Sequence, residues 1–339
     1  MRTLASKPGL LALLLIGGAS LLLVLAVAGI AFGSTPLDAG DVLRVLAGAL
    51  GIGDGLPGPI ARIVLDLRLP RVLLAICVGA GLAVVGVLLQ TTTRNDLADP
   101  FLFGLSSGAA AGAVSVITVF GDRLGVWTLP AAAFAGALVS AAAVLTLMAR
   151  QDGRGPERLV IAGLAVSFLF GALTTWMVFS GDQRAAYSVL FWTAGGLGLA
   201  SWSNLPIGVF GAVLAAGTGL ALRNRLDALL GGEETATSLG VDVGKLRLLV
   251  FALAALATAS LVALSGVIGF VGLMVPHLAR ALVGVRHGAL VATSALLGAI
   301  LLLVSDLASR VVLAPQELPV GIVTSAAGAL FVLAVVLRK

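Results

Sequence analysis

Residues 9–32 read GLLALLLIGGASLLLVLAVAGIAF, a stretch of 24 residues without a charge. A helix needs about 20 apolar residues to cross the hydrocarbon core of a bilayer. No water is available there, so a spanning segment satisfies its own backbone groups as a helix. The stretch follows two basic residues, as a signal peptide would, but it exceeds the roughly 7–15 residues of a signal h-region. We therefore expect a retained transmembrane helix.

Similar apolar stretches recur along the whole chain. Hydrophobic residues make up 59% of the 339 residues and charged residues 11%, with a mean hydropathy of +1.13. Length alone would allow two soluble domains, but this composition predicts an all-α polytopic membrane protein with a single transmembrane domain over 1–339. The predicted spans are 9–32, 72–90, 101–120, 127–149, 159–180, 205–222, 248–264, 265–284, 288–309 and 319–337.

The distribution of basic residues predicts the orientation of these spans. With the N-terminus inside, the inner segments hold 14 of the 21 Lys and Arg residues, and cytoplasmic loops carry such an excess. Both termini and the polar segment 223–247 are then cytoplasmic. The segment 33–71 lies outside, with a short surface helix over Ala39–Leu50. The pI of about 10.3 follows from this bias and from the shortage of acids, so we expect no nucleic-acid partner.

Gly104, Gly108 and Gly112 recur at every fourth position of the third span. Small residues at this spacing let transmembrane helices approach closely. Packing within one subunit is the favoured interpretation, and a seam between subunits is the alternative.

No enzyme or metal site stands out in the sequence. Residues 104–108 fit the pattern G-x-S-x-G, but they start an apolar helix and lack a plausible His–acid pair, so we predict no catalytic residues. Neither His277 nor His287 has a carboxylate or thiol partner nearby in sequence, and Cys77 is the only cysteine. We therefore expect no metal site.

An ion-coupled secondary transporter is the alternative functional class. Asp306 and Arg310 stand one helical turn apart near the end of the ninth span, where such a pair either neutralises itself or marks an ion path. Residues 85–88 (VGVL) and 265–268 (SGVI) also resemble each other weakly across an odd number of crossings. Inverted repeats of this kind occur in many transporters.

Five motifs, in order along the chain, carry a family resemblance. They are RLPR at 68–71, QTTTRNDLADPFLFG at 90–104, ATSLGV at 236–241, GVIGFVGLMVPHLAR at 266–280 and ELPVGIVT at 317–324. From about residue 60 to the C-terminus the chain resembles the FecCD family, the permeases of ABC importers for iron–siderophore complexes, haem and vitamin B12. The resemblance implies a type II ABC importer permease fold of about ten helices in the bacterial cytoplasmic membrane, moving an iron–siderophore complex, or haem or cobalamin.

The resemblance also implies partners. It predicts a second permease subunit, two cytoplasmic ATPase subunits and an extracytoplasmic binding protein that delivers the cargo. No G-x-x-x-x-G-K-[ST] motif occurs in the chain, so we expect ATP and Mg²⁺ on the ATPase subunits and no cofactor on this chain.

Site residues follow from the matched motifs. The binding protein would dock on Arg68, Arg71 and Arg310, and Asn95 and Leu97 would form the cytoplasmic gate, where Asp96 departs from the family's usual Pro. The segment 223–247 would dock on the ATPase through leucines and acids rather than lie on lipid headgroups, since four acids offset its four bases. The predicted coupling residues are Leu226, Leu229, Leu230, Glu233, Glu234, Ser238, Leu239 and Gly240.

A wide, mostly apolar pathway with scattered polar groups suits a bulky chelate. The predicted lining residues are Gln90, Ser106, Ser107, Thr174 and Thr175.

Overall fold

The computed structural model describes residues 8–33, 37–52, 55–119, 125, 127–150, 156–181 and 183–337, and these residues form helices and no strands. One helix corresponds to each of the ten predicted spans. These helices are α1 (Pro8–Ala31), α4 (Leu69–Thr93), α5 (Leu105–Val119), α6 (Thr128–Ala149), α7 (Pro156–Ser180), α9 (Leu205–Ala221), α12 (Val243–Ser265), α13 (Val271–Val283), α14 (His287–Val311) and α15 (Val320–Leu337).

Shorter helices join the long ones. The predicted surface helix is confirmed as α2 (Ala39–Ala49), whose N-terminus is capped by Asp38 and whose Val42 and Val45 are buried. The remaining short helices are α3 (Pro59–Arg62), the π-helix η2 (Ile63–Arg68), the 3₁₀ helix η3 (Pro100–Phe103), α8 (Gln183–Thr193), α10 (Arg223–Leu229) and α11 (Glu233–Ser238).

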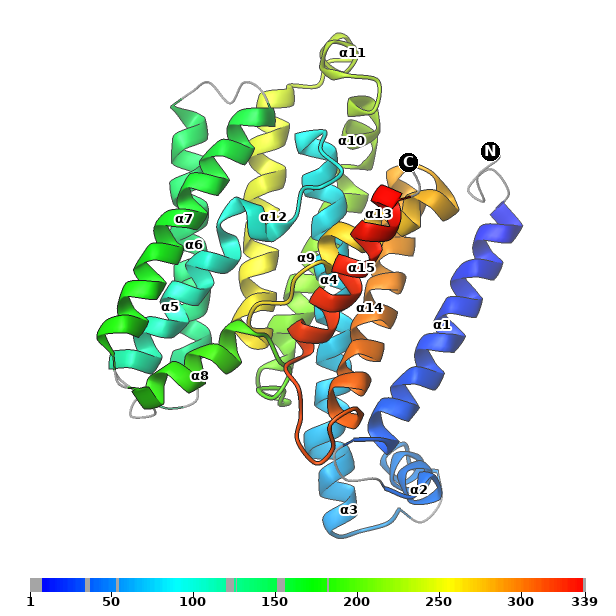
Figure 1. The fold of residues 1–339 in the computed structure, drawn as a ribbon. Coiled ribbons are helices and arrows are strands. Elements are labelled where there is room, and N and C mark those ends of the chain that lie inside the picture. The colour runs from blue at the N-terminus through cyan, green and yellow to red at the C-terminus, as the bar shows by residue number, and fades with distance from the viewer. Residues whose placement is uncertain are drawn as a thin grey trace.

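The bundle has two distinct ends (Figure 1). One carries α10, α11, the start of α1 and the end of α15, and we call it the α11 end. The opposite end carries α2 and α3, and we call it the α3 end. The helix α4 runs between them and packs against α9, α12, α13 and α14, so most of its residues are buried. α4 is therefore the element through which the two ends can be linked.

Tight packing between α5 and α6 explains the spaced glycines. A Cβ on Gly108 would meet the backbone of Gly136 and the side chain of Ser140, and one on Gly112 would meet the carbonyl of Ala132. The interpretation of these glycines as packing within one subunit is confirmed.

Two of the ten predicted spans, those that contain α5 and α13, are interrupted by non-helical residues. By length and composition, seven helices in the described part of the chain can cross a membrane, or eight if α9 and α10, bent by 63°, count as one span. The helices α5 and α13 have only 15 and 13 residues. At about 1.5 Å per residue, both fall short of a hydrocarbon core roughly 30 Å thick.

The break before α13 corrects the predicted eighth span. We expected a helix over 265–284, but residues 266–270 are not helical. Gly266 ends α12 with φ +62° and Phe270 precedes α13 with φ +66°, so a right-handed helix cannot continue through either residue. Residues 85–88 lie inside α4, so the two similar tetrapeptides have different backbone conformations.

A residue with positive φ also interrupts the chain before α5. Gly104, with φ +79°, separates η3 from α5 and ends the short 3₁₀ turn. Non-helical backbone at membrane depth is tolerated where protein buries it or where it lines a cavity. The two breaks therefore direct attention to the space between them.

Candidate functional site

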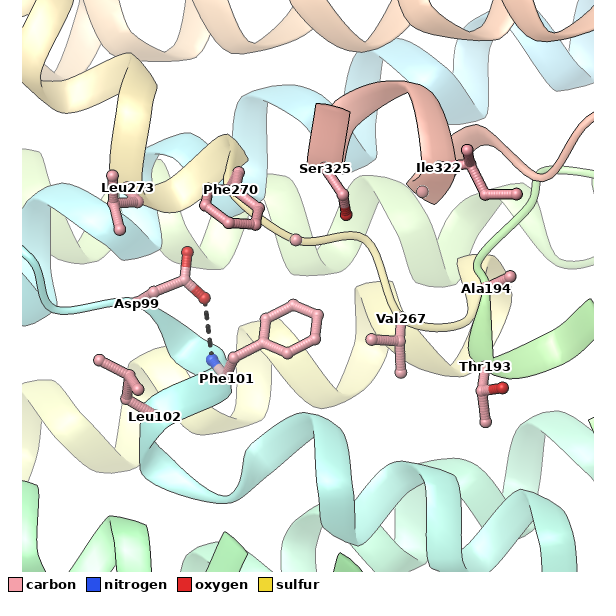
Figure 2. Close-up of a pocket in the computed structure, with 12 residues that line it drawn as sticks. Asp99, Phe101, Leu102, Thr193, Ala194, Val267, Phe270, Leu273, Ile322 and Ser325 are labelled. Atoms are coloured by element: carbon pink, nitrogen blue, oxygen red, sulfur yellow. Dashed lines mark hydrogen bonds between the residues drawn. The ribbon is translucent and has the colours of Figure 1, made fainter. Parts of the chain in front are cut away.

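A pocket of about 620 Å³ lies between the two broken spans (Figure 2). Its walls include Phe101 and Leu102 of η3, Val267 and Phe270 of the second break, and Ile322 and Ser325 of α15. The lining is mostly apolar, with two aromatic rings and a few hydroxyls. Its volume and composition are those of a site for a small organic molecule or chelate.

Asp99 is the single ionisable residue in this lining. It precedes η3, and its Oδ1 accepts a hydrogen bond of 2.9 Å from the backbone N–H of Phe101, drawn as a dashed line in Figure 2. The carboxyl is buried, and desolvation raises its pKa from 3.8 to about 6, although the bond from Phe101 opposes the shift. Asp99 therefore presents a carboxyl group that changes charge just below neutral pH.

None of the predicted lining residues belongs to the pocket lining. The hydroxyls of Ser107, Thr174 and Thr175 donate to backbone carbonyls three or four residues earlier in the chain. The Ser106 side chain is buried. Such back-bonding is the local satisfaction that hydroxyls in helices usually find. Sequence reasoning placed the pathway on hydroxyl-bearing helices, whereas the pocket is formed by the breaks.

The predicted gate residues lie in the turn that follows α4. Asn95 accepts from the N–H of Leu97 at 2.9 Å, which closes the turn, and the Leu97 side chain is exposed. Asp96 forms an ion pair of 3.1 Å with Arg280 of α13. The residue that departs from the family pattern thus ties the turn to a neighbouring helix.

Gln90, predicted to line the pathway, instead holds this region together. Its amide nitrogen donates to the carbonyls of Ala98 and Gly272 at 3.3 and 3.1 Å, and its amide oxygen accepts from Arg280 at 2.5 Å. The side chain is 2% exposed. Gln90 therefore connects α4, the gate turn and α13.

The coupling segment divides into a buried and an exposed set of leucines. Leu226 and Leu229 pack into the core, so they do not offer the apolar contact surface predicted for them, whereas Leu230 and Leu239 are exposed. Ser238 is exposed and donates to the Thr235 carbonyl. Gly240, with φ +82°, and the exposed Glu234 complete the predicted set.

Glu233 has a partner within the chain. Its carboxylate accepts from Arg247 of α12 at 2.7 Å, and Arg247 Nε donates to the Thr92 carbonyl at the end of α4 at 3.1 Å. The Arg247 side chain is 2% exposed. Glu233, one of the acids predicted to dock on the ATPase, is therefore already paired within the chain.

A second link runs from α10. The Asp227 carboxylate accepts from both the backbone N–H and the Nδ1–H of His287, at 2.9 and 2.6 Å. With Nδ1 donating, Nε2 accepts from the Thr91 hydroxyl at 2.9 Å. No carboxylate lies near His287 in the sequence, and the fold supplies one by bringing Asp227 to it across 60 residues.

The described part of the chain contains no cluster of three or more His, Cys, Asp or Glu side chains that could bind a metal ion.

The three arginines predicted to dock the binding protein gather at the α3 end. Arg68 donates to the carbonyls of Ile30 and Ala31 at 2.7 Å each, and Arg310 donates to that of Gly29 at 2.9 Å. Both arginines are buried. They satisfy the free carbonyls at the C-terminus of α1, where the helix dipole also stabilises cations.

Buried charge at this end is compensated by acids. Asp306 forms ion pairs of 2.9 Å with both Arg71 and Arg310, and Arg71 also meets Glu317 at 2.8 Å. The interpretation of Asp306 and Arg310 as a self-neutralising pair is confirmed. Arg71 and Glu317 are the more exposed members of this cluster.

Sequence reasoning missed Asp227, Arg247 and Arg280. Asp227 and Arg280 pair with residues far along the chain and Arg247 with one 14 residues away, so the predicted segment and motif did not reveal these contacts. For Arg247 and Arg280, a cation on an otherwise apolar helix was the available signal, since such residues are almost always paired when buried.

Comparisons with known proteins agree with this architecture. The sequence profile of the FecCD transport family matches residues 21–338. The hemin transport system permease protein HmuU of Yersinia pestis is 39% identical over 278 residues, covering 81% of this chain and 83% of its own length. The ferric enterobactin transport system permease protein FepD of Escherichia coli is 36% identical, covering 98% and 95%.

A cobalamin import system permease protein, BtuC of Halobacterium salinarum, is 37% identical over 82% of this chain and 74% of its own length. Among solved structures, one described as an inward-facing conformation of a metal-chelate type ABC transporter superimposes with a TM-score of 0.82 at 31% identity. It covers 96% of this chain and 99% of its own.

Proposed function

The chain belongs to the FecCD transport family and is a permease subunit of an ABC importer, and we propose that its cargo is a metal chelate. The cargo would be an iron–siderophore complex, or the related chelates haem and cobalamin. The relatives named for hemin, ferric enterobactin and cobalamin support this range. The mostly apolar pocket between the broken spans supports it as well, since it suits a bulky organic ligand.

The proposed assembly contains a second permease subunit, two ATPase subunits and an extracytoplasmic binding protein in the bacterial cytoplasmic membrane. The α11 end would face the cytoplasm, because 14 of the 21 basic residues fall on the segments of that side. ATP and Mg²⁺ would be bound by the ATPase subunits. Cargo delivered at the α3 end would enter the pathway between the two permease subunits.

The surface of α10 and α11 is the observation that carries the ATPase assignment. These short helices stand at the α11 end. Glu234 and the leucines that follow each helix, Leu230 and Leu239, are exposed, while Leu226 and Leu229 anchor α10 in the core. Exposed leucines beside an acid on a rigid base suit an apolar contact with a polar rim. We expect the ATPase to close on these residues and to move both helices.

Compensated charge at the α3 end disfavours the ion-coupled alternative. Asp306 is 0% exposed and meets two arginines, so its charge is already neutralised. A carboxylate that loads and releases an ion needs a state in which it lacks such partners. This favours an importer in which a separate ATPase supplies the energy for transport.

Purification in detergent of the importer from its native host tests the assignment. A nucleotide-binding subunit should co-purify in stoichiometric amount, and the variant Leu239→Asp should release it. Leu50→Asp is the matched control, because Leu50 is a comparably exposed leucine (77% against 68%) at the opposite end. Release by both variants, or co-purification unchanged by Leu239→Asp, would contradict the docking surface.

A further inference from the structure

Three consecutive residues in the last turn of α4 are each tied to a different neighbour. Gln90 bonds Arg280 of α13, the Thr91 hydroxyl bonds His287 of α14, and the Thr92 carbonyl accepts from Arg247 of α12. The three bonds measure 2.5, 2.9 and 3.1 Å. We call this turn with its three ties the α4 junction.

Two of the ties continue to the coupling helices. His287 is held by Asp227 of α10, and Arg247 is held by Glu233 of α11. Both bridging side chains are buried, at 0% and 2% exposure, so they lack the freedom of surface ion pairs. Their acids are partly exposed on the segment that the proposed function gives to the ATPase.

The third tie leads to the gate turn. Arg280 bonds Gln90 and pairs with Asp96, while Gln90 also donates to the Ala98 carbonyl. The end of α4 is therefore connected to Asp96 and Ala98 of the turn 95–98. Coupling between distant sites needs a contiguous set of contacts of this kind with two alternative arrangements.

We propose that the α4 junction transmits the movement of α10 and α11 to the gate turn, with His287 and Arg247 as two parallel input links and Arg280 as the output. This inference rests on the proposed function. It assigns His287, Arg247 and Arg280 as positioning residues, which act through α4 and touch neither nucleotide nor cargo.

The complete importer in detergent, with its own ATPase subunits, allows a direct test. In a Cys77→Ala background, Leu97→Cys places one thiol on the exposed gate residue, and its reaction rate with a maleimide is measured without nucleotide and after trapping with ATP and vanadate. The ratio of the two rates reports the gate response. Co-purification and ATP hydrolysis are followed in parallel.

Asp227→Ala and Glu233→Ala should each reduce the gate response. The double variant should reduce it about tenfold, the size of a typical coupling free energy. Asp227→Asn, which keeps an acceptor for His287, should restore the response. Arg44→Gln is the matched control, because Arg44 pairs with Asp41 at 3.4 Å on the surface of α2, at the opposite end of the bundle. It should leave the response unchanged.

Each outcome is decisive. A gate response in the double variant equal to that of the parental protein, or an equal loss in Arg44→Gln, would overturn the junction. Dissociation of the ATPase from the alanine variants alone would also overturn it, since these acids would then be docking contacts. Failure of the ATPase to co-purify with the parental protein would instead count against the proposed function.

Discussion

The two ends of α4 are both held by arginines and acids, but the contacts differ in kind. At the α3 end, Arg68 and Arg310 bind carbonyls of α1, and Asp306 lies among them with no exposed surface. At the α11 end, the buried Arg247 leads to a partly exposed acid, Glu233, on a short helix. The network at the α3 end also reaches one accessible acid, Glu317, but it centres on the buried Asp306 and the end of α1. The acids at the α11 end lie instead on two short helices that a partner can move. We therefore interpret the α3 end as an anchor and the α11 end as an input.

The largest expected effect would come from breaking the anchor. Asp306→Asn leaves Arg310 buried without its carboxylate, and removing one partner of a buried pair costs about 3–5 kcal/mol. Thermal unfolding in detergent should show this loss. The control Asp41→Asn breaks an exposed pair with Arg44 at the same end, and such pairs contribute at most about 1 kcal/mol. Equal free energies of unfolding for the two variants would contradict the interpretation of the α3 end as an anchor.

Between the ends, Asp99 should make stability depend on pH. The native state holds its proton up to about pH 6, whereas the unfolded chain releases it near pH 3.8, so stability should fall as pH rises between these values. The shift corresponds to a loss of roughly 2–3 kcal/mol. Asp99→Asn should lack this fall when unfolding is followed at pH 4 and pH 7. An unchanged pH profile in the variant would show that Asp99 is ionised throughout.

The contacts to α1 can be removed separately from the buried pair. Arg68→Met loses two hydrogen bonds to carbonyls, and bonds from charged groups contribute about 1.5–3 kcal/mol. We expect faster amide hydrogen exchange at the C-terminal end of α1, with little change around Thr91 and Thr92. The exposed Arg62 provides the control, because Arg62→Met should leave both regions as they are. Faster exchange at both ends would mean that anchor and input are one network.

The smallest expected effect on stability concerns the gate turn. Asp96 is 76% exposed, so Asp96→Asn should change stability by less than about 1 kcal/mol. Amide exchange of residues 95–98 should nevertheless become insensitive to added salt, which screens exposed pairs. A stability loss as large as that of Asp306→Asn would show that the gate turn is anchored like the α3 end.

Much of the fold could be predicted from the sequence, because apolar runs of membrane length are a direct consequence of the solvent. All ten spans have a helix, and the close approach of α5 to α6 follows from Gly108 and Gly112. The breaks could not be predicted in the same way. The segment 266–270 is as apolar as its neighbours, and only the positive φ of Gly266 and Phe270 ends the helix there.

The candidate site was predicted less well than the fold. The motifs identified the coupling segment and the gate turn, but periodicity does not reveal which leucine of α10 faces inward or that Glu233 pairs with Arg247. Those contacts depend on how α4, α12 and α14 come together. The roles of Arg68, Arg71 and Arg310 in docking a binding protein, and of Glu234 and Leu239 in docking the ATPase, stay predictions.

Hydrogen exchange of the complete importer, compared without nucleotide and after trapping with ATP and vanadate, tests the difference between the ends most directly. We predict that exchange changes in residues 90–98 and in α10 and α11, while residues 66–71 and 306–310 keep their rates. Equal changes at both ends of α4, or changes confined to the α3 end, would contradict the account.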